Sequence, residues 1–174
     1  MKRAIALLLL ITLCAPLFAQ QKIAARPTDV DTVDHLIAAL YDVISGPAGQ
    51  KRDWERFRSL CIDGARFIPA STGADKVISA RVYSPEDYIA RATPFFEKEG
   101  FYEQEIHRRT VSYAHIMHVF STYDSRHAKG EKPFARGINS IQLMNDGKRW
   151  WLVTIFWEGE RPETPLPKDA LPAK

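Results

Sequence analysis

Three segments in the first hundred residues place apolar side chains three or four positions apart, which predicts amphipathic helices. Thr28 can cap the first segment, and Ser84-Pro85-Glu86-Asp87 begins the third with a cap, a proline and two acids. Pro94 predicts a kink or an early stop in the third, because an interior proline costs about 3 kcal/mol. The predicted helices run from Thr28 to Ile44, from Asp53 to Cys61 and from Ser84 to Lys98.

A strand pattern replaces the helical one after Gly100. Long runs rich in aromatic and β-branched residues, separated by turns, predict an antiparallel meander, and two short strands precede it. The predicted strands are Ala65 to Pro69, Lys76 to Tyr83, Phe101 to Val111, His115 to Asp124, Phe134 to Met144 and Trp150 to Trp157. Three N-terminal helices packed on one face of a curved, mainly antiparallel sheet predict a single α+β domain over residues 29–158.

The turn Asn145-Asp146-Gly147-Lys148 separates the last two predicted strands. A central Asp-Gly is typical of a two-residue type I′ hairpin, because that turn needs φ > 0 at both central positions. Such a turn would set Leu143 opposite Trp150 and Asn139 opposite Thr154. The predicted register therefore brings two polar residues together on an otherwise apolar sheet face.

A third polar residue joins them if Tyr123 pairs with Phe134, since His118 then lies opposite Asn139. In the row His118-Asn139-Thr154, His118 would be the acid/base or a donor to a ligand carbonyl, with Asn139 orienting it. The alternative is a satisfied buried hydrogen-bond network. The expected ligand-binding residues are Asn139, Thr154, Tyr123, Phe120 and Phe156.

Glu103, Glu105, His107 and Arg109 alternate along one face of the first long predicted strand. They could form a charged pocket wall with Glu105 as base and His107 as acid, although such a row is more often a solvated or dimer-facing surface. The chain has 5 histidines, but no pair has zinc-ligand spacing in its proper setting, so we expect neither a metal nor a cofactor.

The opposite face of the last predicted hairpin favours an interface. Arg136 should face Trp157 as a cation–π pair, with Trp151 on the same face. An apolar sheet face without a helical cover needs a partner, so we expect Arg136, Trp151 and Trp157 to lie in a homodimer interface.

The N-terminus resembles an export signal. Met1-Lys2-Arg3 and the apolar run Ala4 to Leu13 predict a cleaved signal peptide over residues 1–19, too short to span a bilayer. Cys14 allows a lipoprotein alternative, which bulky Leu13 disfavours. We expect a periplasmic or secreted protein with no membrane anchor after cleavage, a loose lead-in over residues 20–28 and a proline-rich flexible tail over residues 159–174.

Charge and cysteine content narrow the functional classes. Cleavage would remove Lys2 and Arg3 and lower the formal net charge from +3 to +1, which leaves no argument for nucleic-acid binding. Cys61 would be the only cysteine left, which excludes an intramolecular disulfide and favours a buried, inert thiol.

The order of predicted elements resembles the nuclear transport factor 2-like superfamily, particularly its SnoaL-like branch. The likeness covers roughly Asp29 to Trp157. It is carried by Ser84-Pro85-Glu86-Asp87-Tyr88, Phe101 to Arg109, His118 to Tyr123, and Gly137 to Leu143 continued through Arg149-Trp150. The resemblance implies a conical fold, a pocket and frequent dimers. It names no reaction, because members include isomerases, cyclases, dehydratases, carriers and binding modules.

Three functions follow from this reading. The first is a pocket that binds a small apolar or amphipathic molecule. The second is a cofactor-independent acid/base enzyme of isomerase, cyclase or dehydratase type. The third is a homodimeric structural or interaction module.

Overall fold

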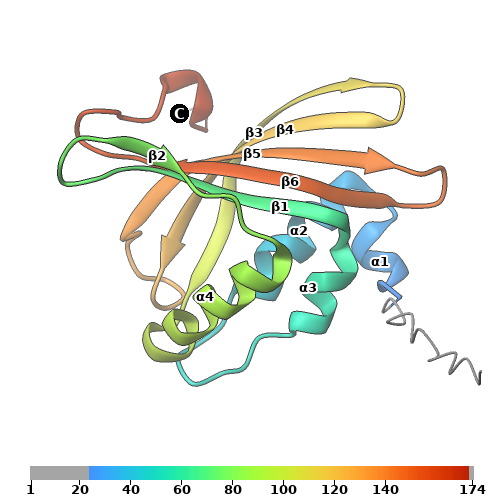
Figure 1. Cartoon of the computed structure of the whole chain (residues 1–174), viewed down its shortest axis with the longest axis horizontal. Helices are drawn as coiled ribbons and strands as arrows, with labels where there is room; N and C mark the ends of the chain where they lie inside the picture. The colour runs from blue at the N-terminus through green and yellow to red at the C-terminus, as the bar shows by residue number, and fades with distance from the viewer. Residues whose placement is uncertain (1–23, 173–174) are drawn as a thin grey trace, which may run out of the picture.

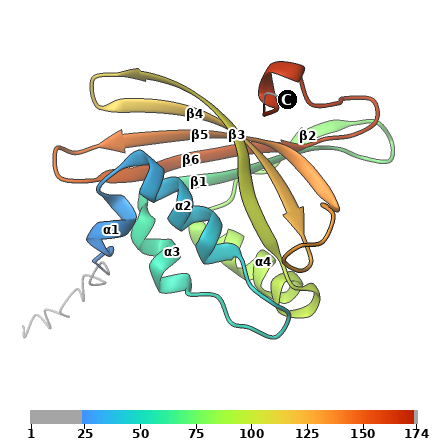
Figure 2. The same ribbon diagram turned by 180° about the vertical axis from the view of Figure 1, so that it is seen from behind.

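A computed structural model describes residues 24–172 and shows one sheet with helices on one of its faces (Figures 1 and 2). The predicted signal peptide and part of the lead-in lie outside the described residues. The helices are α1 (Pro27–Val30), α2 (Val33–Ile44), α3 (Trp54–Leu60), α4 (Pro85–Glu99) and the short 3-10 helix η1 (Lys168–Ala170). The strands are β1 (Cys61–Thr72), β2 (Ile78–Ala80), β3 (Tyr102–Tyr113), β4 (Ile116–Arg126), β5 (Ala135–Asn145) and β6 (Trp150–Gly159).

The six strands are ordered β2-β1-β6-β5-β4-β3. Strands β3 to β6 form the predicted antiparallel meander, whereas β1 lies parallel to β6. The expected α+β architecture, with helices on a mainly antiparallel sheet, is therefore confirmed. We call the side of the sheet that packs on α2, α3 and α4 the helix-covered face, and the other side the open face (Figure 1).

The first predicted helix is divided in two. The Thr32 hydroxyl accepts a hydrogen bond from the His35 backbone N–H (3.1 Å) and caps α2, while α1 begins one residue before Thr28 without a side-chain cap. The prediction that Thr28 caps one continuous helix is wrong, because Thr32 has an extended backbone that interrupts it.

Helix α4 begins where the sequence predicts. Ser84 and Asp87 form a reciprocal capping box, in which the Ser84 hydroxyl accepts from the Asp87 N–H (3.1 Å) and the Asp87 carboxylate accepts from the Ser84 N–H (3.0 Å). The helix continues through Pro94 to Glu99, so the early stop does not occur. Gly100, at φ +66°, then ends it in a conformation that glycine adopts readily.

The core lies between the helices and the helix-covered face. Its fully buried side chains come from α2, α3 and the central strands, and each stabilises the fold by about 1.5 to 3 kcal/mol. The largest of them include Leu36, Ile37, Phe57, Leu60, Phe67, Ile141, Leu143 and Leu152. Cys61 is buried among them as predicted. Between α4 and the helix-covered face this layer opens into a pocket.

The last hairpin has a different register from the predicted one. Asn145 pairs with Trp150, because the Asp146 carboxylate accepts from the N–H groups of Lys148 (2.8 Å) and Arg149 (2.9 Å) and closes a four-residue connection. A bulge then leaves Val153 unpaired between two paired positions. Asn139 consequently lies opposite Trp157, and the predicted pairing of Asn139 with Thr154 is wrong.

The preceding hairpin is also shifted. Tyr123 pairs with Gly137 and His118 with Gln142, whereas the prediction paired Tyr123 with Phe134 and His118 with Asn139. The loop between β4 and β5 is long, so no tight turn fixes its register in the sequence. His118 and Asn139 therefore belong to opposite faces of the sheet.

The segment expected to be a flexible tail lies along the open face (Figure 1). The Thr122 hydroxyl donates to the Ala170 carbonyl (2.7 Å), and Arg109 pairs with Asp169 (2.9 Å). Ala170 is only 1% exposed, so this segment covers part of the open face, for which the sequence predicted a homodimer interface. Within residues 24–172, no helix has the length and apolar character needed to cross a membrane.

Candidate functional site

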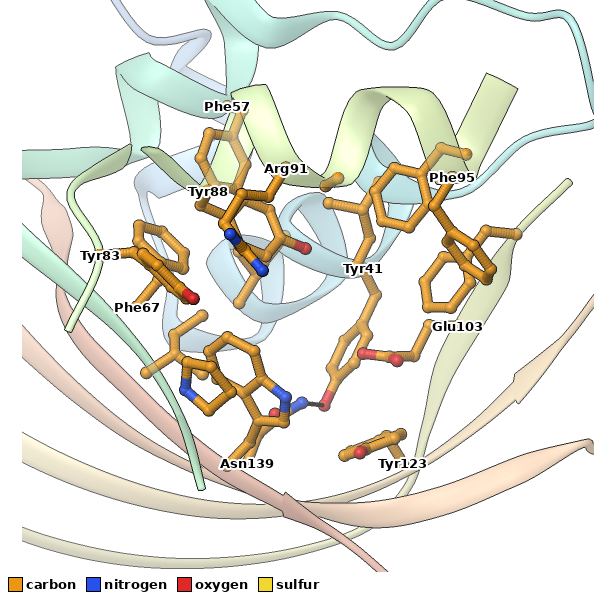
Figure 3. Close-up of a pocket in the computed structure, with 18 residues that line it drawn as sticks. Tyr41, Phe57, Phe67, Tyr83, Tyr88, Arg91, Phe95, Glu103, Tyr123 and Asn139 are labelled. Atoms are coloured by element: carbon orange, nitrogen blue, oxygen red, sulfur yellow. Dashed lines mark hydrogen bonds between the residues drawn. The ribbon is translucent and has the colours of Figure 1, made fainter. Parts of the chain in front are cut away.

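A pocket of about 340 Å³ lies between α4 and the helix-covered face of the sheet (Figure 3). Its walls are mainly apolar and aromatic, with contributions from α2, α3, α4, β1, β3, β4, β5 and β6. The lining residues include Tyr41, Phe57, Phe67, Tyr83, Tyr88, Phe95, Phe96, Tyr123 and Trp157. Among the described residues that line it, Glu103 is the one acid and Arg91 the one base. An aromatic cavity with few polar groups is typical of a site for a small organic molecule.

Glu103 is the chemically distinctive group of this pocket. Its carboxyl accepts a hydrogen bond from the Ser125 hydroxyl (2.8 Å) and another from the Asn139 amide. Burial raises the pKa of Glu103 from 4.5 to about 7; the two hydrogen bonds oppose this rise, and the nearby Asp124 charge adds to it. Desolvation dominates because the apolar pocket replaces the water that would stabilise the carboxylate.

A buried polar network holds the neighbouring groups in place. The Asn139 amide donates to the Tyr41 hydroxyl (3.0 Å), which also shares a hydrogen bond with the Ser121 hydroxyl (2.8 Å). Burial and then the Glu103 charge raise the pKa of Tyr41, so its hydroxyl stays protonated at neutral pH. The network fixes Asn139 beside the Glu103 carboxyl (Figure 3).

Two further tyrosine hydroxyls are available to a ligand. Tyr88 comes from α4 and Tyr123 from β4, and neither hydroxyl has a hydrogen-bond partner among residues 24–172. Burial and the Glu103 charge raise the pKa of both hydroxyls, which keeps them protonated. The pocket therefore offers a carboxyl that titrates near neutral pH together with two neutral phenol donors.

The structure brings some of the predicted ligand-binding residues into this pocket and leaves others out. Asn139 and Tyr123 line it. His118 is exposed on the open face, where its Nε2 lies 2.8 Å from the Ser140 hydroxyl. Thr154 and Phe156 line a shallow depression beside Ser140 on that same face. The predicted polar row His118-Asn139-Thr154 is therefore wrong, because the register shift and the bulge at Val153 separate its members.

Phe120 also points to the open face, where the Arg109 guanidinium lies 5.3 Å from its ring. Glu105 is on the helix-covered face but does not line the pocket; it accepts hydrogen bonds from Arg108 (2.8 Å) and from the Ser121 hydroxyl. These contacts place Phe120 outside the cavity and give the Glu105 carboxylate a charged partner of its own.

The three residues predicted for a homodimer interface do not share a face. Trp157 lines the pocket, while Arg136 pairs with Glu160 (2.8 Å). The Trp151 indole N–H donates to Asp146 (2.8 Å), and the Arg149 guanidinium stacks 3.6 Å from its ring. The predicted cation–π pair between Arg136 and Trp157 is therefore wrong, again because of the bulge in β6.

Sequence reasoning missed Glu103, Tyr41 and Tyr88 as site residues. From the sequence, Glu103 has a predicted role only in an alternating charged row, and Tyr88 falls only in a stretch that carries the family resemblance. The useful signal was the position of Glu103 three residues after the helix-ending Gly100, where the first long strand begins. Among the residues that the structure describes, no group of three or more His, Cys, Asp or Glu side chains is arranged to hold a metal.

Comparisons with known proteins identify the fold. No protein-family model and no curated protein sequence matches the chain significantly. A solved protein of unknown function with a cystatin-like fold from Nostoc punctiforme aligns with a TM-score of 0.56 at 11% identity, over 78% of this chain and 92% of that one. The Kfla4162 protein from Kribbella flavida aligns at 0.53 and 8% identity, over 74% and 88%. A candidate ketosteroid isomerase from Parabacteroides distasonis aligns at 0.50 and 12% identity, over 82% and 99%.

Proposed function

We propose that this chain, which has a nuclear transport factor 2-like fold, is a cofactor-independent acid/base enzyme that moves a proton on a small, largely apolar substrate. The single observation that carries the proposal is Glu103, a carboxyl with a pKa of about 7 in the wall of an aromatic pocket. A group that is about half ionised at neutral pH can both accept and return a proton, which is the requirement for general acid/base catalysis. Assignment to the SnoaL-like branch, export and a homodimer stay predictions.

The donors around Glu103 favour proton removal next to a carbonyl group. Glu103 would take a proton from the carbon beside the carbonyl, and the electron pair of that C–H bond would move onto the carbonyl oxygen to form an enolate. The hydroxyls of Tyr88 and Tyr123 are the donors available to that oxygen. Where a C=C bond lies next to that carbon the enolate is a dienolate, and protonated Glu103 would return the proton to its far carbon. The C=C bond would then shift into conjugation as the carbonyl re-forms, which completes an isomerisation without any cofactor.

A second candidate is non-catalytic binding. Tyr41, Asn139 and Ser121 form a buried hydrogen-bond network that continues to Glu105, and such a network keeps the wall of a binding pocket rigid. Protonated Glu103 would then donate a hydrogen bond to a ligand and remain unchanged. Turnover with a pH profile set by Glu103 separates the two functions.

The neutral probe 5-nitrobenzisoxazole tests the proposal directly. A base removes its carbon-bound proton, the ring N–O bond breaks, and a nitrile and a coloured phenolate form. We expect wild-type turnover to rise with pH along a curve with its midpoint at about 7. Glu103→Gln should be slower on the order of 100-fold. Glu97→Gln makes the same chemical change at an exposed position of α4 and serves as the matched control.

The competing outcomes are distinct. Equal turnover by wild type and Glu103→Gln, with the probe shown to bind, would refute a role for Glu103 as base. Saturable binding without turnover in wild type would favour the binding module. Circular dichroism of each variant shows whether a lost rate reflects a lost fold.

A further inference from the structure

We infer that the substrate of this pocket carries a carboxylate, which pairs with Arg91. The inference rests on the proposed function, since it names the substrate class of the same pocket. Arg91 projects from α4 and lines the cavity together with Tyr83, whose ring centroid lies 5.0 Å from the guanidinium carbon. Its side chain is exposed, which places this cation at the solvent-accessible part of the pocket.

Arg91 differs from most arginines of this chain in having no acidic partner. Side-chain carboxylates pair with the arginines at positions 26, 56, 58, 108, 109, 126, 136 and 161. Backbone carbonyls accept from those at positions 52, 66 and 149. Within residues 24–172, Arg91 forms neither a hydrogen bond nor an ion pair, and its guanidinium lies over the Tyr83 ring. Its guanidinium donors are therefore available to a bound anion.

The arrangement of charges gives the substrate a direction. Arg91 and Glu103 point into the cavity from different walls, one from α4 and one from β3, with aromatic rings between them (Figure 3). A carboxylate beside Glu103 would be repelled by the ionised base, whereas a carboxylate at Arg91 gains a charge-assisted, two-pronged hydrogen bond. The substrate class is thus an apolar acid whose anionic end faces Arg91 and whose neutral, reactive end reaches Glu103.

Tyr83 supports this role by orienting the guanidinium. A ring that lies under the guanidinium limits its rotamers, so less freedom is lost when the anion binds. Since a guanidinium holds a carboxylate through a planar fork, a lysine at position 91 would supply the charge without that geometry. We therefore expect Arg91→Lys to recover only part of the preference for an acid.

The test compares two ligands that differ only in charge, 2-naphthoate and its neutral amide 2-naphthamide, by isothermal titration calorimetry at low ionic strength. Wild type should bind the acid about tenfold more tightly than the amide. Arg91→Gln should lose this preference while its affinity for the amide stays the same. Arg81→Gln is the matched control, because Arg81 is equally exposed on the segment before α4 but does not line the pocket.

Four other outcomes would overturn the carboxylate assignment. Equal affinity of wild type for the two ligands, or a preference that survives in Arg91→Gln, would overturn the carboxylate assignment and leave the Glu103 site standing. If Arg81→Gln loses the preference for the acid as fully as Arg91→Gln does, the overall positive charge attracts the acid, and the carboxylate assignment is also overturned. If neither ligand binds, the carboxylate assignment fails. Turnover of 5-nitrobenzisoxazole by wild type and Glu103→Gln, which is measured separately, then decides whether the proposed function fails with it.

Discussion

The half-buried Glu103, whose carboxyl lies in the apolar pocket, should make the stability of this protein fall as the pH rises through the neutral range. The ordinary pKa of a glutamate is 4.5, and burial raises that of Glu103 to about 7. Between these two pH values the folded state keeps a proton that the unfolded state has released, so the free energy of unfolding decreases with increasing pH. The contribution is fully present below pH 4.5 and is lost above about pH 7.

The magnitude follows from the same two values. The difference between 4.5 and about 7 corresponds to about 3 kcal/mol, which is an upper bound because water entering the pocket would stabilise the carboxylate. Glu103→Gln keeps a carbonyl oxygen as acceptor for Ser125 but cannot ionise. We therefore expect the variant to gain stability relative to wild type by up to about 3 kcal/mol between about pH 5 and about pH 8.

Urea unfolding of both proteins at a series of pH values provides the assay, with the free energy obtained by linear extrapolation. Every other titrating group is common to the two proteins, so the difference between them isolates Glu103. Glu97→Gln, exposed on α4, should stay parallel to wild type across the series. A difference between wild type and Glu103→Gln that is constant from about pH 5 to about pH 8 would refute the argument that burial raises this pKa.

Two other substitutions test the geometry of the sheet. In Gly137→Ala the new methyl group would overlap the Tyr123 hydroxyl and the Glu158 carbonyl. We expect a loss of about 2 to 4 kcal/mol in thermal unfolding, and an unchanged melting temperature would show that β5 can move away. His118→Ala removes one exposed hydrogen bond to Ser140 and should leave turnover of 5-nitrobenzisoxazole within about twofold of wild type. A loss comparable with that of Glu103→Gln would restore His118 as the acid/base.

Much of the fold could be predicted from local signals. The capping box at Ser84, the glycine at position 100 and the runs of strand-forming residues locate α4 and the meander correctly. These features depend on neighbours within a few residues, so the sequence displays them directly. The parallel pairing of β1 with β6 could not be anticipated, because it joins residues about ninety positions apart that share no turn.

The site was harder to predict because it depends on register. Successive strand residues alternate between faces, and one extra residue transfers the rest of a strand to the opposite face. Val153 is such a residue in β6, and it sends Trp157 into the pocket and Phe156 to the open face. Nothing in the alternation of apolar and polar positions marks Val153 as unpaired, so a regular strand was the reasonable expectation.

A second bulge, in β3, explains why the charged row that starts at Glu103 and ends at Arg109 is divided between the two faces of the sheet. A bulge in β3 leaves Ile106 unpaired between Glu105 and His107. Before the bulge, Glu103 faces the helices, where desolvation raises its pKa. After it, Arg109 faces the opposite side and pairs with Asp169 of the C-terminal segment (2.9 Å). A regular β3 would have put Glu103 and Arg109 on one face, as their alternation along the sequence predicts. The bulge at Ile106 thus moves Arg109 to the open face and sets Arg108 on the helix-covered face, where it pairs with Glu105 (2.8 Å).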